Sequence, residues 1–423
     1  MARNPADYAV LGAKKIVVPA FLGILLASLS VRTAVTALSP IAEEVGKDIE
    51  LTSVGMGVIG ALPLAAFALG GALTPYLLRR GTLELGIILA TATLLVGQAG
   101  RMASSSYLEF FVASVFSFVA IGIMTALIPP LIKRYFAARQ ALVTGVYAAG
   151  LSVSLMAPAT FSPIWVESLG WRGVMLVWAI AGAFTIFPWL VVVRNRNGAE
   201  SRFNLESPIG SRGSQHVKLA WALKSRSAWL LSLALAITAL NAFVTFAWLP
   251  TILRDLISMP NTEAGFLLGT FALWGFPLAV TVPWALRKWN KPGIMMQIGS
   301  GLFVLSYLGL IIAPGFAPWL WVTMSGIGTL IFPLVLGLVN RWSLSERGSI
   351  LLTSFMQAAG YTLAFSWPVI VGLVHDWTET WTVSLFLLLG TGILGLFVGH
   401  QMHTWHSIED EVPDLSSEAQ CLT

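Results

Sequence analysis

Apolar segments of about 20 residues recur along almost the whole chain and constrain its fold more than any other feature. Each is long enough to cross about 30 Å of hydrocarbon as an α-helix. The 423 residues are 56% hydrophobic and 11% charged, whereas soluble domains carry about 25% charged residues. A membrane β-barrel needs alternating segments of about ten residues, and these are absent from the sequence. The sequence therefore predicts an all-α integral membrane protein that lies in a lipid bilayer.

We expect twelve transmembrane helices, at residues 16–40, 51–78, 82–100, 107–132, 141–165, 172–193, 228–253, 264–286, 294–313, 318–340, 350–374 and 380–400. The one long polar break falls near the midpoint and is typical of a linker between two domains. We therefore predict an N-terminal six-helix bundle in residues 1–193, a cytoplasmic linker in 194–227, a C-terminal six-helix bundle in 228–400 and a disordered cytoplasmic tail in 401–423.

Lysine and arginine residues mark one face of the predicted bundle. With the N-terminus inside, twenty of the 25 fall in cytoplasmic segments and four fall in loops on the opposite face: Lys47, Arg101, Arg172 and Arg254. By the positive-inside rule both termini are cytoplasmic, and we expect a multi-pass protein of a bacterial inner membrane. Because the basic residues alternate between loops, the net charge of +5 indicates membrane topology and no nucleic-acid partner.

Several other classes of function lack their sequence signatures. The only cysteine, Cys421, leaves no pair for a disulfide or a thiolate metal site. The five histidines are scattered, and the sequence has neither a phosphate-binding lysine loop nor a nucleophile elbow. We therefore expect no metal, no cofactor and no catalytic residues. We expect no removable signal peptide, because the N-terminus lacks a short apolar segment followed by a small-residue cleavage site. A membrane sensor would require a folded signalling domain, for which the linker and the tail are too short.

The two halves of the sequence repeat each other. At an offset of 208, Gly57, Pro75, Arg79 and Arg80 align with Gly265, Pro283, Arg287 and Lys288. Three further regions match at offsets of 204 or 210: Gly122, Ile123 and Pro129 with Gly326, Ile327 and Pro333; Ala148, Ala149, Gly150 and Pro158 with Ala358, Ala359, Gly360 and Pro368; and Trp171 with Trp381. Two parallel six-span repeats are typical of transporters that bind their substrate near the midplane, between the halves.

Arg32 lies deep inside the first span. A charge at this depth costs several kcal/mol unless it faces protein, water or a ligand, so it is a candidate functional residue. The alternative is an arginine that snorkels to the interface. Glu43, the first charged residue after it, is eleven positions away, or about 16 Å along a helix. We favour the functional interpretation. The counterpart region in the second half, Ala236 to Ala242, holds no charge, so the predicted site is asymmetric.

The chain resembles the major facilitator superfamily, and within it the branch of cyanate permeases and 2-nitroimidazole transporters. The matching stretches are Ser30–Pro40, Gly60–Pro63, Pro129–Arg134, Thr144–Tyr147, Phe246–Leu253 and Met356–Tyr361. The resemblance implies two six-helix bundles that rock about a central cavity. The chain departs from the branch at Ser30 and Thr125, where an Asn is common, and the loop after span 2 lacks the usual Asp.

The candidate substrate-binding residues are polar or aromatic and lie inside spans: Arg32, Thr36, Thr125, Tyr147, Asn241, Trp248, Trp274, Gln357 and Tyr361. We expect Arg32 to anchor a negative or electron-rich group. Tyr147, Asn241 and Gln357 would orient the solute through hydrogen bonds, and the aromatic residues would shape the cavity. The alternative for each polar group is an interhelical hydrogen bond, worth about 0.6 kcal/mol.

We therefore predict a secondary active or facilitative transporter of a small anionic or polar planar solute, such as a cyanate-like anion, a nitroaromatic or a small carboxylate. It would work by alternating access as a monomer. The alternative, a multidrug efflux transporter for apolar compounds, would carry an acidic residue in its cavity, and no Asp or Glu lies in the middle of any predicted span. For the same reason coupling is either absent, as in a uniporter, or a proton is co-transported with the solute.

Overall fold

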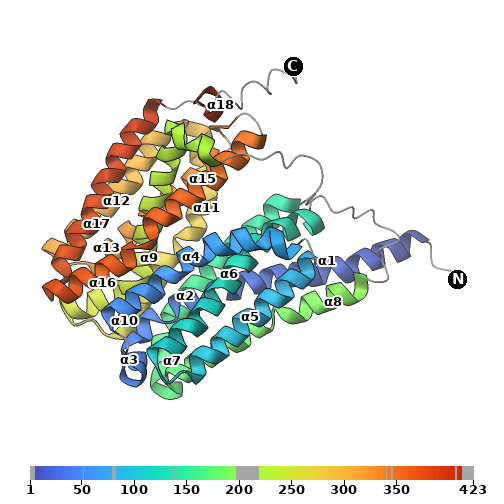
Figure 1. Ribbon diagram of the computed structural model, residues 1–423, viewed down its shortest axis with the longest axis horizontal. Helices are drawn as coiled ribbons and strands as arrows, with labels where there is room; N and C mark the ends of the chain where they lie inside the picture. Colours follow the sequence, from blue (N-terminus) through green and yellow to red (C-terminus); the bar gives the residue numbers. More distant parts are fainter. Residues whose placement is uncertain are drawn as a thin grey trace.

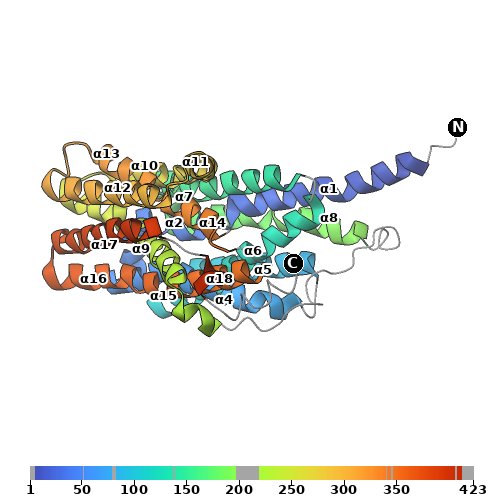
Figure 2. The ribbon, with the colours of Figure 1, turned by 90° about the horizontal axis from the view of Figure 1, so that it is seen from above.

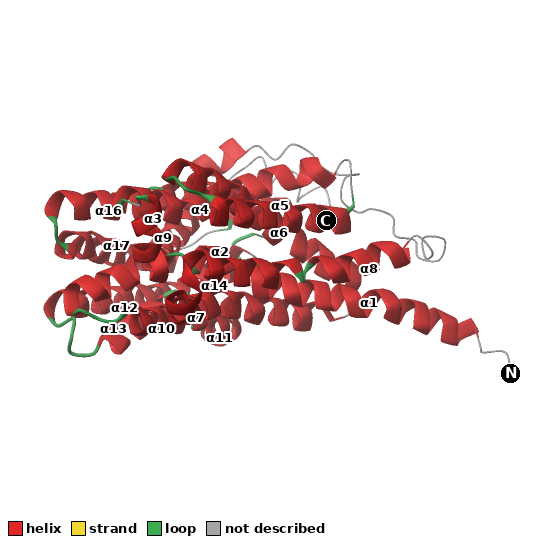
Figure 3. Cartoon of the chain, turned by 90° about the horizontal axis from the view of Figure 1, so that it is seen from below, coloured by secondary structure: helices red, strands yellow, loops and turns green. Residues whose placement is uncertain are grey.

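The protein is described here from a computed structural model, in which residues 5–50, 52–78, 82–136, 139–196, 219–339, 341–343, 346–404 and 407–411 are described. All regular structure in these residues is helical (Figure 3). The N-terminal half contains α1 (Pro5–Ser30), α2 (Thr33–Thr36), η1 (Ser39–Ile41), α3 (Ala42–Ile49), α4 (Ser53–Leu78), α5 (Leu83–Ala103), α6 (Tyr107–Phe136), α7 (Gln140–Ala183) and α8 (Ile186–Arg196).

The C-terminal half contains η3 (Leu219–Lys224), α9 (Arg226–Ile257), α10 (Asn261–Leu273), α11 (Gly275–Trp289), α12 (Pro292–Ile312), α13 (Pro318–Gly328), α14 (Ile331–Val339), α15 (Glu346–Phe365), α16 (Trp367–Thr378) and α17 (Trp381–Gln401). It ends in η4 (Met402–Thr404) and α18 (Ile408–Glu411).

The predicted twelve-span architecture is confirmed. Ten segments of the described chain are long and apolar enough to cross a membrane. One of them, Leu142–Asn195, has 54 residues and must count as two spans, because Gly170 interrupts its helix at φ 65° and ψ 168°. The twelfth span is α4, of which Val54–Phe67 is recognised as a shorter apolar helix.

The six-helix halves lie at an angle to each other (Figure 1), and the view from above has α12, α16 and α17 at one side and α1 and α8 at the other (Figure 2). They meet at the end of the molecule that carries α3 and the turn between α9 and α10, which we name the loop end. They diverge toward the end that carries the start of α1 and α18, which we name the terminal end (Figure 1). The molecule is therefore closed between its halves at the loop end.

Glycines that repeat in the sequence make this closure possible. A Cβ atom on Gly57 of α4 would lie 2.6 Å from the Pro368 carbonyl oxygen of α16. A Cβ atom on Gly265 of α10 would lie 2.4 Å from the Ala159 carbonyl oxygen of α7. Gly57 and Gly265 are counterparts in the duplication, and Ala159 follows the counterpart of Pro368. The duplication therefore produces the same close helix contact twice, once in each direction across the interface.

A second duplicated contact stabilises the loop end within each half. The Trp171 indole N–H donates to an Asp48 carboxylate oxygen at 2.8 Å, and the Trp381 indole N–H donates to Asp255 at 2.9 Å. One ion pair joins the halves in the described chain at this end, between Arg254 Nη1 and Glu43 Oε2 at 3.2 Å. These tryptophans therefore tie the last span of each half to the residues that follow its first span.

Part of the tail is ordered, unlike the disorder predicted for 401–423. The side chain of Ile408 is fully buried, and its backbone N–H donates to the Trp342 carbonyl oxygen at 2.8 Å. The Glu411 carboxylate accepts hydrogen bonds from the Ser225 and Ser227 side chains at the start of α9. An acidic side chain is favourable there because it meets the unpaired N–H groups of a helix N-terminus. Residues 412–423 lie outside the described residues.

Candidate functional site

The first span is broken where it carries its charge. The α-helix of α1 ends at Ser30, and Arg32 adopts φ −109° and ψ 0° before the short α2 begins. The Ser30 hydroxyl bonds back to the Leu26 carbonyl oxygen at 2.9 Å, and the Thr33 hydroxyl bonds back to the Ser30 carbonyl oxygen at 2.8 Å. Such side-chain bonds compete with the helix ladder and bend helices. The Ser and Thr residues around Arg32 thus account for the break.

Hydrogen bonds hold the broken segment to both halves. The Ser30 and Thr185 hydroxyls are 3.2 Å apart, and the Thr36 hydroxyl donates to the Leu155 carbonyl oxygen at 2.8 Å. Further along, the Ser39 hydroxyl crosses the interface and donates to the Ala247 carbonyl oxygen of α9 at 2.8 Å. Arg32 is therefore carried on a fixed, non-helical piece of backbone at the centre of the molecule.

Arg32 has no anionic partner in the described chain. Its guanidinium carbon lies 4.6 Å from the centroid of the Phe67 ring of α4, and the side chains of Tyr147 and Tyr361 lie near it. The Arg32 Nε is buried without a hydrogen-bond partner, although the side chain as a whole is partly exposed. A cation held by aromatic rings and phenols, with free N–H donors, is poised to bind an anion.

The residues around Arg32 come from both halves. Tyr147 of α7 is nearly buried, its hydroxyl has no hydrogen-bond partner, and the Thr125 side chain of α6 lies beside it. Tyr361 of α15 belongs to the other half and packs against Phe67, with ring centroids 6.3 Å apart. The structure therefore brings together four predicted site residues, Arg32, Thr125, Tyr147 and Tyr361.

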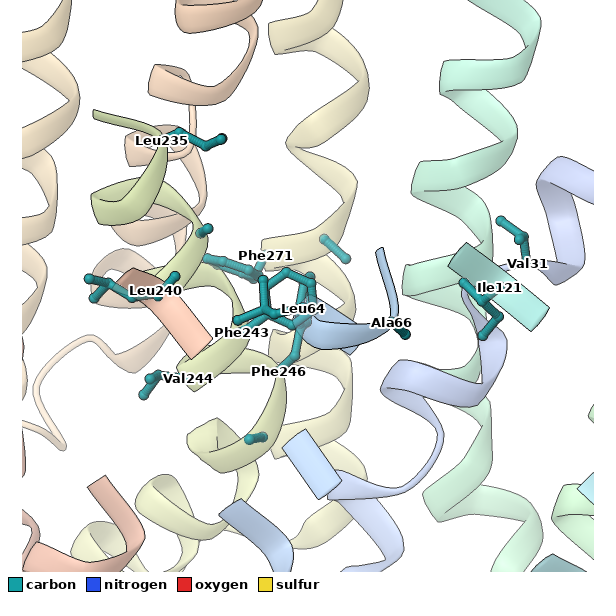
Figure 4. Packing of buried hydrophobic residues seen from close by; sticks show 14 of the residues in the cluster. Val31, Leu64, Ala66, Ile121, Leu235, Leu240, Phe243, Val244, Phe246 and Phe271 are labelled. Carbon is teal, nitrogen blue, oxygen red and sulfur yellow. The ribbon is translucent and has the colours of Figure 1, made fainter. Parts of the chain in front are cut away.

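Two residues of this cluster were not predicted. Phe67 contacts Arg32, and its ring lies 6.1 Å from that of Phe243. Figure 4 shows Phe243 and Phe246 of α9 beside Phe271 of α10 and Leu64 of α4. In the sequence, these phenylalanines are indistinguishable from the many that face lipid or core, and only the fold places Phe67 at the interface.

A narrow cavity lies between the halves on the loop-end side of this cluster. It is lined by Ala34, Val35, Leu38, Met56, Ile59, Gly60, Pro63, Phe118, Phe243, Phe246 and Ala247. These residues come from the broken first span, α4, α6 and α9. The cavity is apolar, and its closure by tightly packed helices separates Arg32 from the loop end in this conformation.

The other predicted site residues are placed elsewhere. Asn241 is buried inside the C-terminal half, where it accepts from the Tyr307 hydroxyl at 2.5 Å and donates to the Thr391 hydroxyl at 3.2 Å. The Trp248 indole donates to the Pro368 carbonyl oxygen at 2.9 Å. Trp274 packs against Gly326. These three side chains hold the C-terminal half together, and Thr36 joins the first span to α7.

Gln357 and Glu84 are two further polar side chains on the membrane-spanning helices. Gln357 is exposed and lies one helical turn from Tyr361 on α15, so it can face the same space as Tyr361. Glu84, at the start of α5, is fully buried and pairs with Arg134 at 3.4 Å and with the Tyr135 hydroxyl. In the described residues no group of three or more His, Cys, Asp or Glu side chains is placed to hold a metal ion.

The comparisons with known proteins agree with this architecture. The model of the Major Facilitator Superfamily matches residues 20–346. The chain is 28% identical over 379 residues to the 2-nitroimidazole transporter of Escherichia coli (strain K12), covering 89% of this chain and 92% of that protein. It is 23% identical over 385 residues to the cyanate transport protein CynX of the same organism, covering 89% and 96%. A crystal structure of a bacterial homologue of the human lysosomal transporter Spinster superposes with a TM-score of 0.65 at 15% identity, covering 98% and 96% of the two chains, and shares the fold.

Proposed function

Because this chain belongs to the Major Facilitator Superfamily, we propose that it is a transporter of small planar anions or polar planar solutes, anchored at Arg32. Transport of small solutes across a membrane is the activity of the family and of the similar proteins. The substrate class and the role of Arg32 are our inference. The names of two similar proteins, a 2-nitroimidazole transporter and a cyanate transport protein, describe small planar or linear solutes with electron-rich ends.

The single observation that carries the proposal is the unpaired guanidinium at the junction of the halves. Arg32 is partly exposed, but a cation deep in a membrane span without an anionic partner is unfavourable unless it faces water or a ligand, so its position favours a role in binding. Arg32 belongs to the N-terminal half, and Tyr361, which interacts with it, belongs to the C-terminal half. A solute bound to Arg32 would therefore contact both halves, as alternating access requires.

The surroundings of Arg32 favour a flat anion over an apolar or cationic solute. The guanidinium supplies N–H donors, and Phe67, Tyr147 and Tyr361 supply aromatic rings around it. A cationic drug would need a carboxylate, and the buried carboxylate of Glu84 is already paired with Arg134. A weak acid could enter as an anion together with a proton, so we keep both predicted alternatives for coupling, a uniporter or co-transport of a proton.

We further propose that the terminal end faces the cytoplasm, as the distribution of lysine and arginine predicts. The contacts of Gly57 and Gly265 would then close the outer side, and the diverging ends would face inward. The domain boundaries predicted at residues 193 and 228 remain part of this proposal.

The test is transport of radiolabelled solutes into proteoliposomes that contain the purified protein. The panel contains cyanate, nitrate, benzoate and 2-nitroimidazole. We expect specific transport of at least one of these by the wild type. Arg32→Ala should abolish it, and Arg32→Lys, which keeps the charge but loses the planar fork, should retain a small fraction. Transport by Arg32→Ala at the wild-type rate would refute the anchor role.

A further inference from the structure

Arg101, at the loop-end side of α5, is a buried cation that the sequence analysis assigned to a loop on the face opposite the cytoplasm. Only 1% of its surface is exposed. The structure therefore corrects the predicted position of its charge, which lies inside the N-terminal half. The guanidinium carbon lies 4.7 Å from the centroid of Phe110 and 5.8 Å from that of Phe118. No carboxylate in the described chain lies within 4 Å of its nitrogens.

Among the described residues, hydrogen-bond partners are found for one of the three Arg101 nitrogens. Nη1 donates to the Ala34 carbonyl oxygen at 3.3 Å and to the Gln98 side-chain oxygen at 3.2 Å. Nε and Nη2 are buried and have no partner. In a guanidinium, the N–H bonds of Nε and Nη2 point in parallel from one edge, and this edge pairs with two oxygens of a carboxylate or a similar planar anion.

A purely structural role does not explain this arrangement. Holding the Ala34 carbonyl oxygen requires one N–H donor, which an uncharged side chain could supply. Each buried donor that stays unpaired disfavours the folded state. The unpaired Nε and Nη2 donors of Arg101 therefore do not stabilise the fold in the present conformation.

Arg101 adjoins the cavity between the halves. Ala34, whose carbonyl oxygen accepts from Arg101, lines that cavity, and so does Phe118, whose ring lies against the guanidinium. The opposite wall consists of Phe243, Phe246 and Ala247 of the C-terminal half. When the loop ends separate, this wall moves away and the cavity widens beside Ala34 and Phe118, the two lining residues that contact Arg101.

We propose that the Nε/Nη2 edge of Arg101 is a second anion-binding site, which takes a planar two-oxygen anion such as a carboxylate or nitrate at the loop end. This proposal rests on the proposed function of Arg32. The anion binds first at Arg101 when the loop ends are apart, then passes along the broken first span to Arg32. In this proposal each of the two cations serves one opening of the protein.

Transport kinetics measured from each side test this proposal. Nitrate and benzoate are offered to membrane vesicles in which the loop end faces out, and to inverted vesicles. We expect Arg101→Lys, which retains the charge without the two-donor edge, to raise the KM from the loop end at least about tenfold, as expected for loss of one charge-assisted hydrogen bond. The KM from the terminal end should change by less than about twofold, because Arg32 is intact.

Gln98→Leu is the matched control, since it removes an acceptor from Nη1 and leaves the free edge in place. We expect its KM from the loop end to stay within about twofold of the wild type. An unchanged loop-end KM in Arg101→Lys would overturn the second site and leave Arg32 unaffected. An equal increase of the KM from both sides, in both Arg101→Lys and Gln98→Leu, would also overturn the second site. It would indicate that Arg101 acts only by positioning the backbone at Ala34. Transport of cyanate or 2-nitroimidazole but of neither nitrate nor benzoate by the wild type would overturn the second site alone. Transport of none of the four solutes of the panel would overturn the proposed function itself.

Discussion

The closure at the loop end makes a quantitative prediction about Gly265. In Gly265→Ala the new Cβ atom would lie 2.4 Å from the Ala159 carbonyl oxygen, whereas ordinary contacts begin at 3.4 Å. The helices must therefore separate by about 1 Å, and overpacking of this kind costs about 1–3 kcal/mol. The strain exists only while α10 and α7 are in contact. We expect the substitution to raise the ratio of loop-end-open to loop-end-closed molecules about 5- to 150-fold.

The assay measures how often the loop end opens. Ser39 is only 4% exposed and lies in the closed interface, so Ser39→Cys in a Cys421→Ser background reports opening through its reaction with a maleimide. The labelling rate is proportional to the open population when closing is fast. The rate should rise about 5- to 150-fold in Gly265→Ala. Gly390→Ala is the control, because a Cβ atom there meets no neighbour within 4 Å. A labelling rate in Gly265→Ala equal to that of the control would refute the reasoning.

Two further predictions concern other parts of the molecule. The Trp171 indole and the Arg172 guanidinium hydrogen-bond to the Asp48 carboxylate and hold its pKa below the usual 3.8. The stabilisation by the ionised Asp48 carboxylate is fully present above pH 3.8 and is lost as the pH falls through the lowered pKa. The difference in melting temperature between the wild type and Asp48→Asn should therefore shrink below pH 3.8. A difference in melting temperature that is independent of pH would contradict this prediction. Tyr147→Phe removes a buried hydroxyl without a partner, so the melting temperature of the ligand-free protein should stay the same or rise. The affinity for the anion should fall about 2- to 12-fold, as expected for loss of one hydrogen bond. A lower melting temperature with an unchanged affinity would contradict this interpretation.

The fold followed from the sequence because membrane spans are specified by length and polarity. Apolar segments of about 20 residues identify helices, and breaks between them locate loops. The offset of 208 identified Gly57 and Gly265 as counterparts, and in the structure both contact the backbone of the opposite half. The repeat therefore marked contact positions that a count of spans does not mark. The contact partners could not be predicted, because the sequence carries no information on which helices cross. The ordered turn at Ile408 was missed because its stability comes from packing against Trp342.

The candidate site was only partly predictable. Arg32 was identifiable because a charge in a long apolar segment is unfavourable wherever the helix packs. Tyr147 was expected at the central cavity because it lies in span 5, and the structure places it and Tyr361 near Arg32. Their role in binding a solute stays a prediction. Asn241 was assigned to the same site, yet its amide is satisfied by Tyr307 and Thr391 inside one half. A polar side chain within a span indicates that it has a partner, and only the structure shows whether that partner is protein or an open space.

The anchor role of Arg32 is tested most directly by thermal unfolding of the wild type and Arg32→Gln, each with and without an anion of the transport panel. A ligand present at 100 times its Kd stabilises the folded protein by about 2.7 kcal/mol. Since Arg32 is an unpaired cation, Arg32→Gln should unfold at the same temperature as the ligand-free wild type or at a higher one, and the anion should no longer raise it. If Arg32→Gln keeps the anion-induced increase of the wild type, the account of this site is wrong.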